Sequence, residues 1–364
     1  VDERALEPLS TLHSDTNSDV RLSSAIAIAR YAEKQIVSEK TITSLIKLLS
    51  DEYNAIRGIS ALAVSLYADK GIVEKKALAP LVNLLKQEDT DIIANACSAI
   101  AQYARSELIH EEALEYLINL LGKEEKVSTK ASDAVVQYAK KGKMNADALR
   151  PLVDLLTDKN TENPFDVLTA INIYAENDIV SADALEPLTK RLEDEKPEIR
   201  KAASAAIATY SRKALLDEKT LKPLSRLLSY DDLEIRSNAT DAISEYAKRG
   251  IVDEDILENM ITLLEGEKTS IWGKAIKSIA FYAEKQLFSE KALKPLTKLL
   301  SNEDADIRRN AVYAMVRYAE NKSFYNEAVE PLIYLLKDKD VNIRINSVNA
   351  LGIYAENHLV NHKT

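Results

Sequence analysis

Residues 289–320 read SEKALKPLTKLLSNEDADIRRNAVYAMVRYAE, and this stretch contains the pattern that organises the whole chain. A polar residue, Ser289, opens an apolar segment that contains Pro295-Leu296 and ends in the pair Leu299-Leu300. A short polar turn follows, and a second segment rich in small residues ends at Tyr318. The rest of the chain aligns on three of these features: the proline–leucine step, the leucine pair and the tyrosine.

The tyrosine recurs every 36 residues, with one shorter interval of 35 between Tyr103 and Tyr138. The proline–leucine step and the leucine pair recur in the same register, and three independent signals in one register exclude coincidence. The chain is therefore predicted to consist of ten tandem repeats. The tyrosines are Tyr31, Tyr67, Tyr103, Tyr138, Tyr174, Tyr210, Tyr246, Tyr282, Tyr318 and Tyr354. The prolines are Pro8, Pro80, Pro151, Pro187, Pro223, Pro295 and Pro331, and the residues that replace proline are Ser44, Tyr116 and Asn259.

The composition agrees with a folded helical protein and excludes several other classes. Of the 364 residues, 46% are apolar and 29% are charged, whereas 8 glycines and 9 prolines are too few for the turns of an all-β protein. The single cysteine excludes a disulfide framework, and no apolar run approaches the roughly 18 residues of a membrane span. The net charge of -10 argues against nucleic acid as a partner. We therefore expect a cytoplasmic, intracellular protein without membrane insertion.

Each repeat is predicted to form two helices joined by a polar turn. The first opens at a capping residue and runs for about a dozen residues, and its proline should bend or loosen it. The second ends near a glycine in three repeats, which is typical of a left-handed C-cap. Its apolar and small residues recur at helical spacing before the tyrosine, so they share one buried face. The capping residues are Asp2, Ser38, Asn145, Ser181, Asp217, Asp253 and Ser289, and the glycines are Gly71, Gly142 and Gly250.

A turn that ends in an acidic residue, then Ile or Val, then Arg, and that precedes a helix rich in small residues, resembles HEAT and HEAT-like repeats. Armadillo repeats are the near relative. The resemblance implies an all-α fold, a right-handed α-α solenoid (superhelix) of ten two-helix repeats. It places a single solenoid over residues 1–360 and the start of a further repeat at 361–364, and it implies a curved surface that holds other proteins. The segments that carry it are Asp19-Val20-Arg21, Glu198-Ile199-Arg200, Glu234-Ile235-Arg236 and Asp306-Ile307-Arg308, with looser versions at Ala55-Ile56-Arg57 and Asn342-Ile343-Arg344.

The arginine ten residues before the tyrosine is predicted to form a ladder of acid–arginine pairs between neighbouring repeats. The alternative is an exposed basic row. We expect repeats three to five, which lack this arginine, to form a change of curvature or a softer hinge, with a second helix that restarts at Asn163-Pro164. Trp272 either fills the space of a missing arginine or acts as a binding anchor. The residues that replace the arginine are Ile93, Ser128, Pro164 and Trp272.

Function is predicted to lie on the stripe of each second helix that is formed by the positions 12, 8, 5 and 1 before the tyrosine. The Trp–Asn pair with which armadillo relatives clamp an extended peptide is absent from this stripe, so that mechanism does not carry over. Repeats eight to ten combine cations, aromatic rings and amides, which suits an acidic or phosphorylated protein segment. Repeat two offers an aliphatic site. The alternatives are a solvated face with packed aromatics for the first segment and burial against the neighbouring helix for the second. The predicted partner-binding residues are Lys274, Lys277, Phe281, Asn310, Tyr313, Arg317, Asn346 and Asn349 in the first segment, and Ile59, Leu62 and Leu66, beside Ile26, in the second.

No catalytic constellation is found in the sequence, which has neither a Gly-rich phosphate loop nor a nucleophile elbow. Cys97 stands in a small-residue core position, and no metal site is expected from His358 and His362, although they lie four residues apart. No cofactor is predicted. The sequence therefore predicts a non-catalytic scaffold or adaptor that presents a concave surface to protein partners. The alternatives are a HEAT-like lyase or chaperone acting on a protein-bound cofactor, and a self-assembling structural segment.

Overall fold

A computed structural model of the chain describes residues 3–157, 164–266 and 271–357. Twenty α-helices and eight short 3-10 helices make up the regular structure of these ranges, and no strand occurs in them. Short first helices alternate with longer second helices, and the pairs coincide with the ten predicted repeats. The predicted all-α solenoid of two-helix repeats is therefore confirmed. The predicted capping residue Asp2 and the tail at 361–364 lie outside the described residues.

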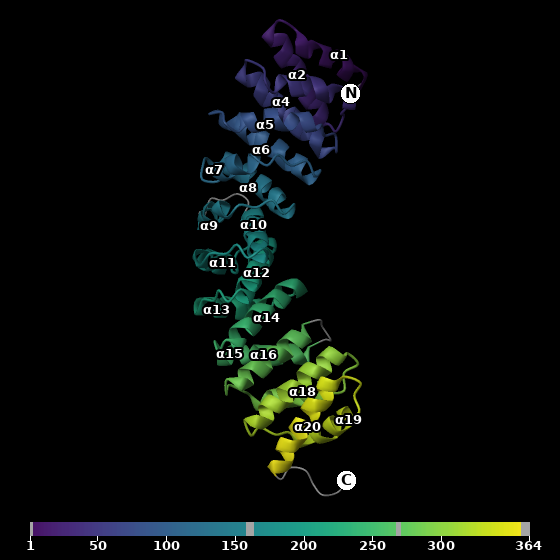
Figure 1. Cartoon of the computed structure of the whole chain (residues 1–364), viewed down its shortest axis with the longest axis vertical. Helices are drawn as coiled ribbons and strands as arrows, with labels where there is room; N and C mark the ends of the chain where they lie inside the picture. Colours follow the sequence, from purple (N-terminus) through teal and green to yellow (C-terminus); the bar gives the residue numbers. More distant parts are fainter. Residues whose placement is uncertain (1–2, 158–163, 267–270, 358–364) are drawn as a thin grey trace. The chain divides into compact units, whose positions relative to one another are not determined.

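The helices form two compact units, Val1–Pro187 and Leu188–Thr364, and each unit has its own row of second helices. Within each unit, successive second helices lie side by side, and first helices pack on the second helix of their own repeat (Figure 1). The first unit contains η1 (Glu3–Ala5), α1 (Leu6–Thr11), η2 (Leu12–Ser14), α2 (Ser18–Glu33), α3 (Glu39–Leu48), α4 (Asn54–Asp69), η3 (Lys75–Ala77), α5 (Leu78–Leu84), α6 (Thr90–Arg105), α7 (Ala113–Leu120), α8 (Glu125–Lys140), η4 (Ala146–Ala148), α9 (Leu149–Thr157), α10 (Pro164–Glu176) and η5 (Ala182–Ala184). The division falls within α11 (Leu185–Arg191). The second unit contains α12 (Pro197–Arg212), η6 (Glu218–Thr220), α13 (Leu221–Leu227), α14 (Leu233–Lys248), α15 (Glu254–Glu265), α16 (Trp272–Glu284), η7 (Glu290–Ala292), α17 (Leu293–Leu299), α18 (Ala305–Glu320), η8 (Asn326–Ala328), α19 (Val329–Leu335) and α20 (Val341–Glu356).

The proline of the first helix determines how that helix begins. In all seven repeats that have it, a 3-10 turn precedes a short α-helix, and the proline is the third residue of that α-helix. Where Ser44 or Asn259 replaces proline, α3 and α15 run without interruption from the capping residue, over 10 and 12 residues. A proline is accommodated in a first turn because the N–H it lacks has no acceptor within the helix there. The proline therefore loosens the start of the helix, as predicted, and does not bend its middle.

Capping residues mark the start of several helices. All six described capping residues predicted for the first helices are confirmed as N-caps. The second helices have their own caps, which the sequence did not single out: in α14, for example, Asp232 accepts the N–H groups of Glu234 and Ile235 at 2.8 and 3.1 Å. Such bonds satisfy donors that have no partner within the helix. Asn163, the predicted cap of α10, lies outside the described residues.

The second helices whose ends are described all end in the same left-handed turn. The residue four positions after the tyrosine has a φ between 59° and 85° in all nine repeats in which it is described. The N–H of the next residue donates to the tyrosine carbonyl, which is the hydrogen bond of a Schellman motif. The glycines Gly71, Gly142 and Gly250 are thus confirmed as left-handed C-caps. The other six repeats place a side chain at this position: Gln35, Glu107, Asp178, Ala214, Gln286 and Lys322.

The repeating tyrosine closes the core of each repeat. Nine of the ten rings are fully buried, and Tyr31 is half-buried. In five repeats the hydroxyl reaches back to the residue that opens the first helix of the same repeat: that of Tyr103, for example, accepts the N–H of Glu74 at 3.3 Å, and that of Tyr174 accepts the N–H of Asn145 at 3.4 Å. One residue type therefore supplies both a large apolar ring and a polar tip that bonds to a helix start.

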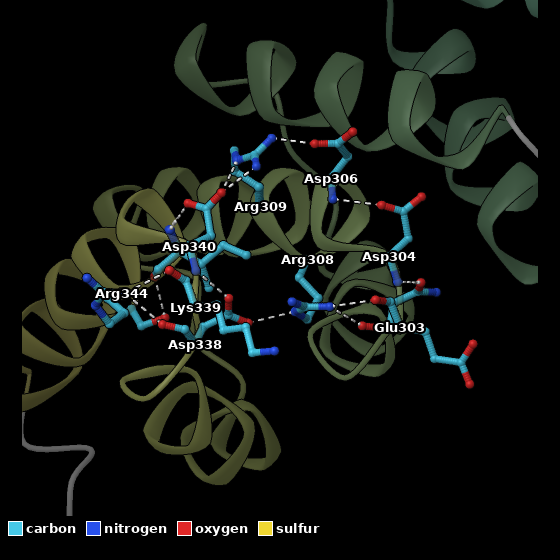
Figure 2. Close-up of polar contacts among 12 residues, drawn as sticks. Glu303, Asp304, Asp306, Arg308, Arg309, Asp338, Lys339, Asp340 and Arg344 are labelled. Atoms are coloured by element: carbon cyan, nitrogen blue, oxygen red, sulfur yellow. Dashed lines mark hydrogen bonds and ion pairs between the residues drawn. The ribbon is translucent and has the colours of Figure 1, made fainter.

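The predicted ladder of acid–arginine pairs is confirmed at two positions, one in each unit. The Nε of Arg21 donates to Asp51 of the next repeat at 2.7 Å. Arg308 donates to Asp338 of the next repeat at 2.8 Å and to the carbonyl of Glu303, in its own turn, at 2.9 Å (Figure 2). Each of these arginines closes the turn before its own helix and ties that helix to the neighbouring repeat.

In other repeats the arginine uses a different partner from the next repeat. Arg57 donates to the side-chain carbonyl of Gln87 at 3.0 Å. The guanidinium of Arg200 stacks 4.5 Å from the ring centre of Tyr230. The position of the arginine is thus more regular than the chemistry of its partner.

Residues that replace the arginine take over parts of its role. The hydroxyl of Ser128 donates to the carbonyl of Leu121, and the indole N–H of Trp272 donates to the carbonyl of Leu263 at 3.1 Å. Ile93 is buried. These contacts favour the interpretation of Trp272 as a filler of the arginine's space, and the softer hinge at repeats three to five stays a prediction.

Candidate protein-binding surface

The predicted stripe positions come together because successive second helices are neighbours within each unit. In the first unit α2, α4, α6, α8 and α10 are adjacent in turn, and in the second unit α12, α14, α16, α18 and α20 are (Figure 1). Side chains at equivalent stripe positions therefore form rows that cross the helices. The core positions of the same helices are filled by small and aliphatic residues and the tyrosine, so that only the stripe varies in chemistry.

The first unit carries the predicted aliphatic site on α2 and α4. Ile26, Ile59, Leu62 and Leu66 are all half-buried. Ile59 packs, together with Leu22, against the core cluster of repeats one and two. Burial against the neighbouring helix, the alternative reading of this site, is therefore correct for one side of Ile59. The aliphatic row keeps part of its surface in contact with solvent.

The aromatic residues predicted in the second unit contact its cations. Lys277 is exposed, and its ammonium lies 5.7 Å from the ring centre of Phe281. The guanidinium of Arg317 lies 5.0 Å from the ring centre of Tyr313 and pairs with Glu320 at 2.9 Å. Cation and ring are held together in both cases by spacing along one helix.

The hydroxyl of Tyr313 donates to the carboxylate of Glu284 on the preceding second helix. Burial, followed by this hydrogen bond and the negative charge of Glu284, raises the pKa of Tyr313 to about 12. Tyr313 therefore acts as a neutral hydrogen-bond donor between α16 and α18, and its ring remains half-exposed on the stripe.

Two other predicted residues contact the neighbouring repeat. Lys274 pairs with Asp241 of α14 at 2.6 Å, and Asn310 donates to the carbonyl of Gly273 at 3.3 Å. Because Lys274 and Arg317 already have carboxylate partners, this surface is less cationic than the sequence suggested. The remaining predicted amides belong to α20, where Asn346 is half-buried and Asn349 is exposed.

A hollow of about 250 Å³ lies on this surface of the second unit. It crosses four successive second helices, and it includes three of the predicted residues: Lys274, Lys277 and Asn310. Arg212, at the end of α12, also lines the hollow and was missed by the sequence analysis. Arg212 lies two residues after its tyrosine, outside the four stripe positions, and no repeating signal marks it. The complete lining is Arg212, Asp241, Ser244, Glu245, Gly273, Lys274, Lys277 and Asn310.

The acidic row at the position 12 before the tyrosine is partly neutralised by neighbouring helices. Asp91 of α6 pairs with Lys126 of α8, and Glu234 of α14 pairs with Lys201 of α12 at 2.5 Å. Asp306 pairs with Arg309 on its own helix (Figure 2). These ion pairs lie at the surface, where solvent screens them and each contributes little to stability.

Two residues whose side chains could take part in chemistry, Cys97 and His13, are buried. Cys97 is fully buried, and burial raises the pKa of its thiol well above the ordinary value. His13 is buried beside Ser44, and His358 and His362 lie outside the described residues. Within the described ranges, no group of three or more His, Cys, Asp or Glu side chains could hold a metal ion. None of the described helices is both long enough and apolar enough to cross a membrane.

Family models match three parts of the chain. The model of HEAT repeats matches residues 293–361, the model of the armadillo/beta-catenin-like repeat matches residues 72–105, and a model of non-SMC mitotic condensation complex subunit 1 matches residues 167–286. No curated protein matches the chain at the level of its sequence.

A solved structure shows the same architecture. A chain from work described as "A conserved phosphorylation switch controls the interaction between cadherin and beta-catenin in vitro and in vivo" matches with a TM-score of 0.78 and 13% identity, over 96% of this chain and 82% of that chain. At this identity the likeness concerns the fold alone. A designed armadillo repeat protein matches at 23% identity over 66% of this chain and 99% of its own, with a TM-score of 0.40. The chain is thus an all-helical solenoid of two-helix repeats, parts of which match family models of HEAT and armadillo repeats.

Proposed function

We propose that the chain is a non-catalytic scaffold or adaptor that holds protein partners along the stripe of its second helices. The observation that carries this proposal is the aliphatic row Ile26, Ile59, Leu62 and Leu66, whose side chains are only half-buried. A protein segment that covers the row removes this apolar surface from water. Repeat solenoids of this family commonly serve as interaction scaffolds, which agrees with the proposal.

In the second unit, the surface proposed to hold a partner is aromatic and cationic. Phe281 and Tyr313, with Lys277 and Arg317 stacked against them, form the aromatic and cationic kind of surface that dominates protein interfaces. An acidic or phosphorylated protein segment is the proposed ligand here. Nucleic acid is not proposed, because the row of Asp91, Glu234 and their equivalents would repel a phosphate backbone.

An affinity pull-down with four forms of the chain tests the scaffold proposal. The wild type is compared with Lys277→Glu/Tyr313→Ala/Arg317→Glu, with Leu62→Glu/Leu66→Glu, and with Tyr334→Ala as the control. Tyr334 is 78% exposed on a first helix, away from the stripe. We expect each stripe variant to lose at least one partner that the control retains. Identical partners for all four forms would contradict the proposal.

Self-assembly is a second candidate, because α20 exposes apolar side chains. Val341, Ile345 and Val348 are 52%, 52% and 59% exposed on this helix. A second copy that covers this face would bury them. Sedimentation over a wide range of concentrations tests this candidate: a monomer mass that does not change with concentration excludes it, and Val348→Glu should restore a monomer if association is seen.

A further inference from the structure

The lining of the hollow on the second unit combines small residues with long charged ones. Gly273 has no side chain and Ser244 has a short one, whereas the charged residues around them are long. Four helices contribute: Arg212 ends α12, α14 and α16 supply most of the lining, and Asn310 comes from α18. The site is therefore built from the repeat stacking within one unit and includes no loop.

Some of the charged residues around the hollow already have ion-pair partners, and others do not. The lining contains three cations and two carboxylates, so its formal sum is +1. Both carboxylates already have partners within the fold: Asp241 pairs with Lys274 at 2.6 Å, and Glu245 pairs with Arg249 at 2.5 Å.

The two remaining cations have no carboxylate partner among the described residues. Arg212 is exposed and donates to the hydroxyl of Thr209 on its own helix at 3.0 Å. Lys277 is exposed and lies over the ring of Phe281. Arg212 and Lys277 therefore leave charged donors available at one hollow, and the amide of Asn310 has a second N–H besides the one that bonds to the carbonyl of Gly273.

We propose that this hollow binds the carboxylate of an aspartate or glutamate in the protein segment that the scaffold holds. Arg212 and Lys277 bind the carboxylate oxygens, since an ionised acceptor on a guanidinium forms the stronger class of hydrogen bond. The site rests on the proposed function, and it makes that function specific for acidic segments.

A carboxylate fits this site better than a phosphate does. Arg212 and Lys277 are two cations for the two oxygens of a carboxylate, whereas a phosphorylated residue brings a third charged oxygen and about -1.5 to -2 charges at neutral pH. With both cations bound, the third oxygen would face Asp241 and Glu245, which the fold holds in place. The two kinds of acidic ligand are thereby distinguishable.

Selection from a random twelve-residue peptide library, with the full chain as bait, provides the test. The best peptide is then synthesised with its acidic residue as Glu, as Gln and as phosphoserine, and the affinities are measured by fluorescence anisotropy. We expect the selected peptides to share an acidic residue, the Gln form to bind at least tenfold more weakly, and the phosphoserine form to bind no better than Glu.

Matched variants test whether the peptide binds at the hollow. Arg212→Gln/Lys277→Gln should lose the preference for Glu over Gln, and Lys222→Gln/Lys298→Gln, with the same change in charge on first helices, should keep it. Asp241→Asn raises the formal sum to +2 and should improve binding of the phosphoserine form. Circular dichroism checks that each variant is folded.

Each outcome separates the two proposals. Selected peptides without a shared acidic residue, or equal affinities of the Glu and Gln forms, would overturn the carboxylate site and leave the scaffold proposal standing. Tighter binding of phosphoserine to the wild type would overturn the choice of carboxylate. A selection that enriches no peptide would count against the scaffold proposal itself, and the carboxylate site would fall with it.

Discussion

Tyr246 and Asp217 are bonded in both directions: the tyrosine hydroxyl donates to the backbone carbonyl of Asp217 at 3.0 Å and accepts its backbone N–H at 3.1 Å. Asp217 is also the N-cap of the first helix of that repeat, since its side chain accepts the N–H of Lys219. The end of the second helix is thereby fastened to the start of the first. The same pair of bonds joins Tyr138 to His110 and Tyr354 to Tyr325.

Removal of this hydroxyl should destabilise one repeat. Tyr246→Phe leaves the N–H and the carbonyl of Asp217 without their buried partner, and we expect a loss of about 1–2 kcal/mol. Urea unfolding and hydrogen exchange of α13 and α14 measure it. Tyr230→Phe, at a turn where the ring stacks on Arg200, is the control and should change stability by less than about 0.5 kcal/mol. Equal effects of the two variants would show that the hydroxyl bonds do not support the repeat.

The contribution of the contact between repeats can be measured separately from that of the hydrogen bonds by which each arginine closes its own turn. Arg308 bonds to its own turn and to Asp338, whereas Arg344 bonds to its own turn through the carbonyls of Asp338 and Lys339 (Figure 2). We expect Arg308→Gln to cost about 2 kcal/mol and Arg344→Gln about half of that, measured by urea unfolding. The difference is the contribution of the contact between repeats.

Acid should weaken the contact between Arg308 and Asp338. Burial raises the pKa of Asp338, but the hydrogen bonds from Arg308 and from the N–H of Asp340 outweigh it, so the pKa lies below its ordinary value. The carboxylate therefore stabilises the fold above the ordinary pKa of about 3.9, and this contribution is lost as the pH falls through the lower, folded value. Asp338→Asn should remove that part of the acid dependence, and an unchanged profile would contradict the assignment.

His13 should make the first unit sensitive to a milder fall in pH. Its Nδ1 lies 2.8 Å from the hydroxyl of Ser44, which itself donates to the carbonyl of Thr41, so Nδ1 carries the proton. Burial is the main cause that lowers the pKa of His13 to about 4, from an ordinary 6.5. The unfolded chain then takes up the proton first, so stability is constant above about 6.5 and falls, by at most about 3 kcal/mol, as the pH decreases to about 4. Hydrogen exchange of α1 to α3 at pH 7 and pH 4.5 measures this, and His13→Gln should abolish the difference.

A single substitution at a left-handed turn should stabilise the protein. Ala214 has a φ of 63°, which costs a residue with a Cβ about 1 kcal/mol relative to glycine. We expect Ala214→Gly to raise the free energy of unfolding by about 0.5–1 kcal/mol. Ala202→Gly, within α12, is the matched control and should lower it by about 1 kcal/mol. Destabilisation by Ala214→Gly would mean that the turn tolerates the side chain without strain.

Much of the proposed binding surface could be predicted from the sequence, but the partners of its side chains could not. The stripe follows from helical spacing, so Lys277, Phe281 and Tyr313 were found as surface residues. The partners of these residues come from other repeats or other turns of the helix: Glu284 bonds to Tyr313, and Asp241 neutralises Lys274. Arg212 was missed because it reaches the hollow from the end of α12, where no stripe position lies.

The sequence by itself determined the number of repeats, the two helices of each and the place of the core, because a buried position recurs at a constant interval and must be filled by the same kind of residue each time. Tyr246 and its nine equivalents occupy such a position. Only the tertiary structure decided which surface charges are available for binding. An ion pair such as Lys274–Asp241 joins two side chains that are 33 residues apart, and the residue types at their two stripe positions vary from repeat to repeat, so the periodicity of the sequence does not predict the pair. Arg212 and Lys277 are left without a carboxylate by the same stacking of repeats, and the proposed acidic ligand depends on that arrangement.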